Sequence, residues 1–197
     1  MTQPDLDTLK ATYAKTVCDQ SQWIHSAKRL LASAQLVGSE ATSRWKFWRD
    51  SLSKGKSLPN AYEAHHFQAV YLLLVGFAIE NLLKGHLLSK GKDSFYEGIL
   101  KTGRFPQSLD RRHDLVSLAR SCGFESTNEE LISLQRLAKH SRWIGRYPFP
   151  MDYREHFTLS STNKVPTTGK AWSSKEIETI NALVRTFCSK LNIQIDF

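Results

Sequence analysis

Hydrophobic residues recur at helical spacing along most of this chain. Over residues 6–36 the apolar positions form an approximate helical stripe, and Gly38 is well suited to end this first predicted helix. A second helix is predicted over residues 61–89, with Asn60 as its N-cap and Gly91 as its stop. Two long helices therefore occupy the first half of the chain.

The second predicted helix is unusual because residues 70–75 are hydrophobic on every side. A helix that is apolar all round is typical of a buried core helix. Gly76 and Gly85 lie within it and cost roughly 1 kcal/mol each relative to alanine. We expect neighbouring helices to approach closely at these two glycines. The same apolar segment carries Glu80 and Lys84, and a buried charge is costly unless it is paired.

The middle of the chain contains shorter elements. Residues 92–112, with two glycines and a proline, are predicted to form an irregular connection. A short helix is expected over residues 114–122, with Gly123 as its stop. Thr127 and Glu130 then have the spacing of a capping box, which predicts the start of another helix.

The last quarter of the chain combines a loop and a helix. The helix that starts at the capping box should end near Gly145, because two prolines follow it closely. Residues 146–172 are rich in Pro, Ser, Thr and Gly and predict one long loop, with a short strand at 156–159. A final helix is predicted over residues 173–191, again from a capping box. The whole pattern predicts an all-α single domain over 1–197, a bundle of about five helices.

Composition restricts the classes of function. The chain has 27 Lys and Arg against 19 Asp and Glu, a net charge of +8, which favours anionic partners such as RNA or equally a solubilising surface. The three cysteines, with no C-x-x-C pair, are expected to be buried free thiols rather than disulfides or zinc ligands. The chain starts with no signal peptide pattern, and the apolar run at 70–79 is shorter than a bilayer span. We therefore expect a cytoplasmic protein without membrane, metal or cofactor.

Two short motifs resemble those of a known superfamily. Residues 77–85, Phe-Ala-Ile-Glu-Asn-Leu-Leu-Lys-Gly, resemble the Glu-x-x-x-Lys helix of HEPN domains, and residues 112–115, Arg-His-Asp-Leu, are similar to the start of a later HEPN helix. The resemblance implies an α-helical bundle that is commonly dimeric. Many HEPN proteins are metal-independent RNases of toxin–antitoxin, defence or RNA-processing systems, and others bind nucleotides, RNA or partners without catalysis.

One departure from that pattern affects the predicted activity. Catalytic HEPN domains carry an Arg and a His separated by four to six residues, whereas Arg136 and His140 are separated by three. These two residues still share one helix face, where Arg can stabilise a phosphate and His can transfer protons near neutral pH. The alternative is a solvated basic face. The resemblance therefore supports the fold more than the RNase activity.

The candidate site residues divide into two groups. Glu80 either forms an internal ion pair with Lys84 or orients a basic residue at a pocket, with His140, Arg142 and Arg146 as candidate partners. The candidate catalytic residues are Glu80, Arg136 and His140, and the candidate RNA- or anion-binding residues are Lys84, Arg142, Arg146 and Tyr147.

Other basic and aromatic positions have a structural alternative. The basic groups near Gly145 can instead complement a helix dipole. Residues 43–49 alternate basic and aromatic side chains, which indicates either a stacking surface for nucleic acid or tryptophans buried in the core, and we favour the core. The sequence thus predicts a HEPN-like protein that binds RNA or a nucleotide. The alternative is a non-catalytic module for protein–protein interaction, such as homodimerisation.

Overall fold

The computed structural model describes residues 5–55, 61–110, 113–144, 158–159, 166–167 and 174–195. Within them lie seven α-helices: α1 (Leu6–Val17), α2 (Gln20–Ser53), α3 (Ala61–Lys90), α4 (Lys92–Thr102), α5 (Leu115–Ser121), α6 (Asn128–Lys139) and α8 (Ser174–Lys190). A 3-10 turn, η1 (Gln107–Leu109), and a π-helical turn, η2 (His140–Ile144), complete the helical elements. The all-α prediction is confirmed, but the prediction of about five helices was too low.

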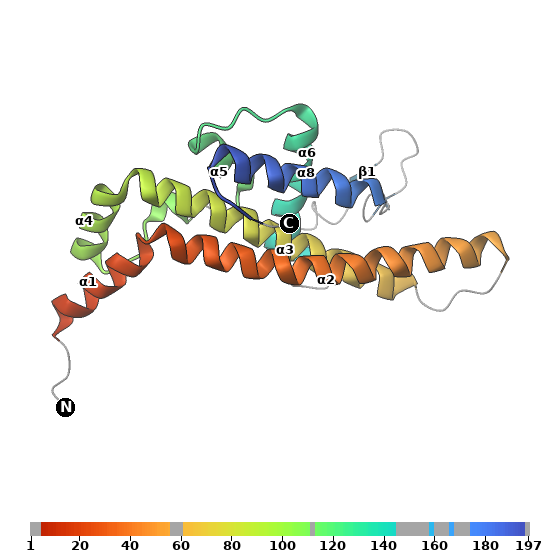
Figure 1. Cartoon of the computed structure of the whole chain (residues 1–197), viewed down its shortest axis with the longest axis horizontal. Coiled ribbons are helices and arrows are strands. Elements are labelled where there is room, and N and C mark those ends of the chain that lie inside the picture. Colours follow the sequence, from red (N-terminus) through yellow and green to blue (C-terminus); the bar gives the residue numbers. More distant parts are fainter. Residues whose placement is uncertain are drawn as a thin grey trace.

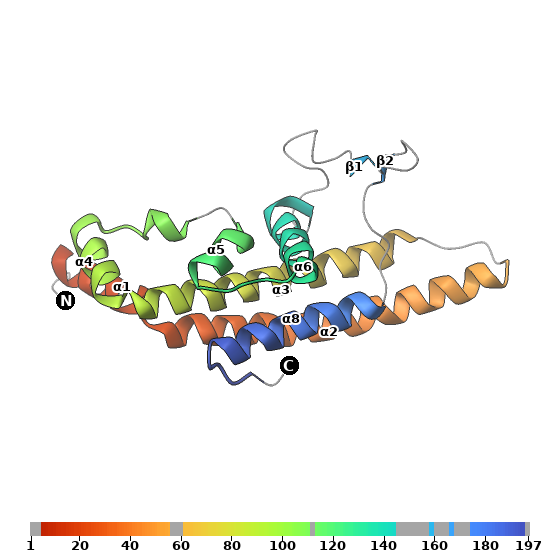
Figure 2. The same ribbon diagram turned by 90° about the horizontal axis from the view of Figure 1, so that it is seen from above.

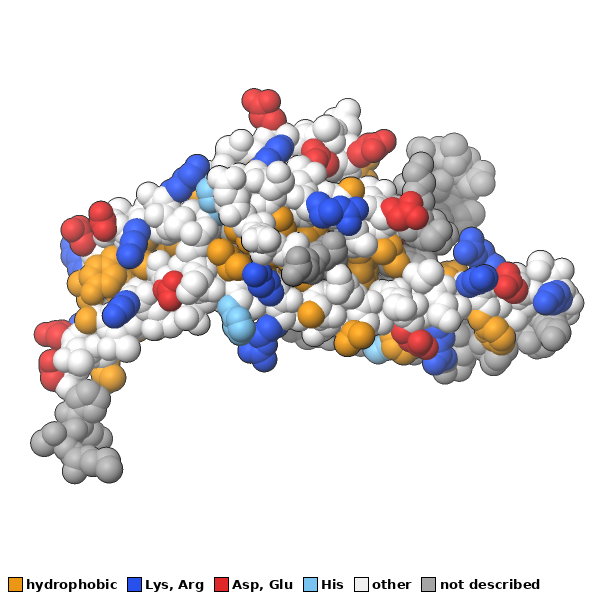
Figure 3. Space-filling model, viewed as in Figure 1, with side chains coloured by type: hydrophobic (Ala, Val, Ile, Leu, Met, Phe, Trp, Pro, Cys, Tyr) orange, Lys and Arg blue, Asp and Glu red, His pale blue; other side chains and the backbone are white. Residues whose placement is uncertain are grey.

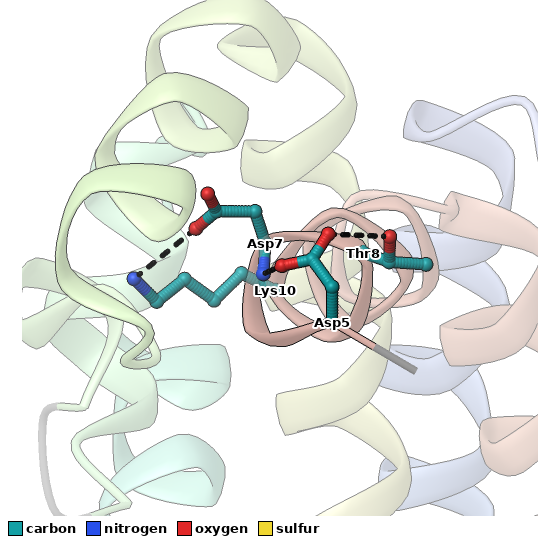
Figure 4. Close-up of polar contacts among 4 residues, drawn as sticks. All are labelled: Asp5, Asp7, Thr8 and Lys10. Carbon is teal, nitrogen blue, oxygen red and sulfur yellow. Dashed lines mark hydrogen bonds and ion pairs between the residues drawn. The ribbon is translucent and has the colours of Figure 1, made fainter. Parts of the chain in front are cut away.

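The first reason for the extra helices is a break near the N-terminus. The helix predicted over 6–36 is interrupted at Cys18, because the Asp19 carboxylate accepts a hydrogen bond from the Ser21 backbone and caps a new helix, α2. α1 has its own cap, since Asp5 accepts hydrogen bonds from the Asp7 backbone and the Thr8 hydroxyl (Figure 4).

The prediction that Gly38 ends the first helix was also wrong. α2 continues through Gly38 to Ser53. A Cβ at this position would lie 2.9 Å from the ring of Tyr71 in α3. Gly38 is therefore a contact position between two long helices, which the sequence pattern cannot distinguish from a helix stop.

The second reason is α4, which occupies part of the predicted irregular connection. It ends at Gly103, whose φ of 66° lies in the left-handed region. Ile99 of α4 is fully buried in a small apolar cluster with Ala14 and Leu88. Burial of this apolar face outweighs the cost of Gly98 within the helix.

The long helices α2 and α3 run antiparallel along the length of the molecule (Figures 1 and 2). α3 also contacts α4, α5, α6, η2 and α8, so it is covered on several sides. Its central apolar residues are at most 1% exposed: Tyr71, Leu72, Val75, Ala78, Ile79, Leu82 and Leu83. The prediction of a buried central helix is confirmed.

The glycines of α3 lie at close helix contacts, as predicted. A Cβ on Gly76 would clash with the Ser141 hydroxyl oxygen and would lie 3.2 Å from the Leu137 carbonyl oxygen. A Cβ on Gly85 would lie 2.7 Å from the Cβ of Trp23 in α2. α3 can therefore approach α2 on one side and the α6–η2 junction on the other only because these positions lack side chains.

The predicted signals around α5 and α6 are confirmed. The Asp114 carboxylate caps α5, and Gly123 has a φ of 80° just after it. Thr127 and Glu130 form both hydrogen bonds of the capping box. The helix then continues as η2 up to residue 144, next to the predicted end at Gly145.

Only a small part of the predicted 146–172 loop lies among the described residues. Thr158–Leu159 (β1) pairs antiparallel with Pro166–Thr167 (β2), which agrees with part of the strand predicted over 156–159. The start of the final predicted helix at residue 173 also lies outside the described residues, while α8 itself begins at Ser174.

The remaining structural predictions concern cysteines and tryptophans. All three cysteines, at positions 18, 122 and 188, are free and buried, as expected. Trp45 is 7% exposed and Trp48 packs beside it against the core, so the core interpretation of residues 43–49 holds for these rings, although Phe47 is 65% exposed.

One helical stretch bears on the membrane prediction. By length and composition alone, His66–Lys90 of α3 is long and apolar enough to cross a bilayer, unlike the shorter run considered from the sequence. Its contacts with six other elements show that it serves as the core helix of this fold. The absence of a membrane association stays a prediction.

Candidate functional site

Glu80 is a buried carboxylate with two cationic partners. Its side chain is 6% exposed, and its Oε1 atom lies 2.6 Å from Lys84 Nζ. Its Oε2 atom lies 2.6 Å from His113 Nδ1, at the start of the α5 region. The predicted pair with Lys84 is confirmed. Among the described residues the second partner is His113 and not His140 or Arg142, while Arg146 lies outside them.

Local structure explains how these three residues meet. Lys84 follows Glu80 by one turn of α3, the favourable order for an ion pair on a helix. His113 immediately precedes the α5 cap and has a φ of 64°, an uncommon value for a residue with a side chain. Because α3 packs against α5, this left-handed turn brings the imidazole to the carboxylate.

Aromatic rings line the same cluster. The His113 ring lies 5.3 Å from the Phe77 ring, and Lys84 Nζ lies 5.6 Å from the centre of the Phe105 ring. These rings limit water around the charges and strengthen their attraction. We call Glu80, Lys84 and His113 the Glu80 cluster.

The protonation of Glu80 follows from these contacts. Burial raises the pKa of Glu80, but the hydrogen bonds and charges of His113 and Lys84 together lower it by more. The pKa of Glu80 is therefore below the usual carboxyl value. Glu80 is therefore ionised at neutral pH. His113 is 28% exposed, so the cluster reaches the surface through its imidazole.

Arg136 and His140 make contacts separate from those of the Glu80 cluster. Arg136 forms an ion pair with Glu176 and so links α6 to α8. His140 is 7% exposed, and its Nδ1 donates to the Arg136 carbonyl oxygen at 2.9 Å. Among the described residues neither one contacts Glu80, whose partners are Lys84 and His113. These contacts favour a structural role, and the catalytic role stays a prediction.

Burial changes the titration of His140. Burial lowers the pKa of His140 to about 4, and the nearby charges of Arg136 and Lys139 lower it as well, against the effect of the Arg136 carbonyl. His140 is therefore neutral at pH 7.

We expect His140 to make the fold sensitive to mild acid. Between pH 6.5 and about 4 the unfolded chain binds a proton at this position and the folded chain does not, so stability falls as the pH falls. The loss over this window should approach roughly 3 kcal/mol. Urea unfolding of the wild type and of His140→Gln at several pH values measures it. If the free energy of unfolding falls equally with pH in the two proteins, the assignment to His140 is wrong.

The other predicted residues are only partly placed. Arg142 is exposed on η2. Arg146 and Tyr147 lie outside the described residues. Within the described part of the chain, no group of three or more His, Cys, Asp or Glu side chains is arranged to hold a metal ion.

Comparisons with protein-family models, with curated proteins and with solved structures find no match for this chain. The HEPN resemblance therefore rests on the two motifs in the sequence. The second of these motifs contains His113 and the first contains Glu80 and Lys84, so the fold brings the two motifs into contact.

Proposed function

We propose that this chain is a HEPN-like helical bundle protein that binds RNA, and that the Glu80 cluster is its phosphate-contacting site. One observation supports this most strongly: a buried carboxylate holds a half-buried imidazole at 2.6 Å while also holding a lysine at 2.6 Å. Net charge alone is weaker support, because basic and acidic side chains are interspersed on the face shown in Figure 3.

Each member of the Glu80 cluster has a distinct role in this proposal. Glu80 accepts the Nδ1 proton of His113, which fixes the ring orientation. The other ring nitrogen of His113 contacts a phosphate oxygen, and Lys84 supplies positive charge. Arg111 and Arg112 precede His113 in the sequence and add charge to this segment.

The same arrangement suits cleavage of RNA without a metal. An imidazole oriented by a carboxylate transfers protons near neutral pH, as phosphodiester cleavage by the ribose hydroxyl requires. We assign this role to His113 rather than to His140, because His140 is buried and held neutral. The defence or toxin–antitoxin setting and the cytoplasmic location stay part of this proposal.

RNA binding by three proteins tests the proposal: the wild type, His113→Ala, and His25→Ala as a control at an exposed position of α2. Loss of one charge-assisted hydrogen bond should weaken binding of single-stranded RNA about tenfold in His113→Ala at low salt, and His25→Ala should match the wild type. Circular dichroism confirms folding of each variant. Equal affinity of all three proteins would reject the site.

A cleavage assay on the same proteins separates binding from catalysis. Cleavage that disappears in His113→Ala supports the catalytic role of the Glu80 cluster. Cleavage that persists there and disappears in His140→Ala would return that role to Arg136 and His140. RNA binding without cleavage leaves a binding protein.

A homodimerisation module is the second candidate function. α1 exposes Leu6, Leu9 and Tyr13 at spacings of three and four residues, and they are 65%, 50% and 41% exposed. An exposed apolar stripe of this kind is typical of an interaction surface. Absence of RNA affinity together with a dimer in sedimentation would favour this candidate, and a monomer that binds RNA would reject it.

A further inference from the structure

A basic hollow lies at the opposite end of the contact between α3 and α5. Its volume is about 350 Å³, and its walls include His86 and Lys90 of α3, Lys190 of α8, and Phe124 and Glu125 after α5. We call these five residues and their cavity the basic hollow. His86 and Lys90 follow Glu80 by six and ten residues, or about 9 to 15 Å along α3. The hollow is therefore separate from the Glu80 cluster.

The charges in the hollow are unbalanced. His86 and Lys90 lie one turn apart on α3, Lys190 lies at the end of α8, and both lysines are exposed. Among the described residues of the lining, Glu125 is the one acidic side chain. Burial lowers the pKa of His86, and the nearby positive charge of Lys90 lowers it as well. The charges of Lys90 and Lys190 therefore favour an anion in the hollow.

Structural roles account for part of this arrangement. α3 and α8 end at Lys90 and Lys190, and a lysine in the last turn complements the helix dipole. Lys190 Nζ also lies 5.3 Å from the centre of the Phe124 ring. Neither contact involves His86, which is partly buried and lies one turn before Lys90 in the lining of the hollow.

We propose that the basic hollow binds the phosphate group of a small phosphorylated ligand. A phosphate presents several acceptor oxygens to donors from different directions, which suits His86, Lys90 and Lys190 on two separate helices. A volume of 350 Å³ holds a phosphate with a small attached group. Gly123, with a φ of 80°, keeps one wall free of a side chain.

Substitutions in the hollow should change phosphate affinity in opposite directions. Titration of the full chain with inorganic phosphate, followed by NMR, measures this affinity. Lys90→Gln and Lys190→Gln should each weaken binding about fivefold or more, since each removes a charge-assisted contact. Glu125→Gln should tighten binding, because it removes the acid that opposes the anion. Lys46→Gln, an equal charge change on an exposed part of α2, should have no effect.

The His86 resonance gives a second readout. Bound phosphate should raise the pKa of His86 from its lowered value. Among the described residues, the other titratable or charged groups that line the hollow are Lys90, Lys190, Glu125 and Cys122. A soluble phosphate ester and vesicles of phosphatidic acid, tested in parallel, distinguish a free ligand from a lipid headgroup.

Three results would overturn the proposal: no resonance shift in the hollow at tens of millimolar phosphate, an equal loss of affinity in Lys46→Gln, or no gain in Glu125→Gln. The proposal does not depend on RNA binding. Phosphate binding that survives in His113→Ala would separate this site from the Glu80 cluster.

Discussion

Replacing Glu80 with leucine is expected to destabilise the fold by about 3–5 kcal/mol at pH 7. Glu80 is 6% exposed and Lys84 is 12% exposed, so the substitution leaves a lysine in a largely dry position without its counter-ion. His113 loses its carboxylate partner at the same time. Urea unfolding measures the change as a lower midpoint with an unchanged slope.

A double variant shows whether the loss of stability comes from leaving Lys84 without its counter-ion. Glu80→Leu/Lys84→Met removes both charges, and it should be clearly more stable than Glu80→Leu alone, because an apolar pair can replace a buried ion pair at little cost. If the single substitution costs less than about 1 kcal/mol, or the double variant is the less stable of the two, Lys84 does not depend on Glu80.

Substituting alanine at two helical glycines should give opposite results. Gly85→Ala places a Cβ 2.7 Å from the Cβ of Trp23, an atom that no side-chain rotation can move away. The helices must separate, and overpacking of this kind costs about 1–3 kcal/mol. Gly98 of α4 has no atom within 4 Å of an added Cβ, so Gly98→Ala should stabilise the protein by up to about 1 kcal/mol through helix propensity.

Thermal unfolding of the two alanine variants checks this pair. Both substitutions add one methyl group inside a helix, so Gly98→Ala is a direct control for the propensity gain. A Gly85→Ala protein as stable as Gly98→Ala would show that α2 and α3 do not approach as closely as the structure indicates.

Local signals predicted the parts of the fold that depend on a few neighbouring residues. The capping box at Thr127 and the stop at Gly123 are set by hydrogen bonds and backbone angles within one turn. The burial of α3 was also predictable, because its apolar residues cover all sides.

The wrong predictions, at Gly38 and over α4, share a different cause. Gly38 has the composition of a helix end, and only the position of Tyr71 in another helix shows that it is a packing contact. α4 contains a glycine and a weak apolar face, and it is stabilised by its contact with α1. Tertiary packing decided both cases, and a local pattern does not contain that information.

The candidate site shows the same division. Lys84 was predictable as a partner of Glu80 because four residues on a helix make one turn. His113 lies 33 residues from Glu80 in sequence, so the pairing required the packing of α3 on α5. Likewise, the spacing of Arg136 and His140 indicated a shared face, but not that Arg136 pairs with Glu176 of α8 or that His140 is buried.

Titration with single-stranded RNA at low salt, followed by ¹⁵N NMR of the histidine side chains, shows directly whether the Glu80 cluster contacts RNA. We expect the two ring nitrogens of His113 to shift early in the titration, while those of His25, on the exposed face of α2, do not. We also expect Glu80→Gln to remove the His113 response, since the carboxylate orients the ring. RNA binding that leaves the His113 nitrogens unchanged would contradict the account.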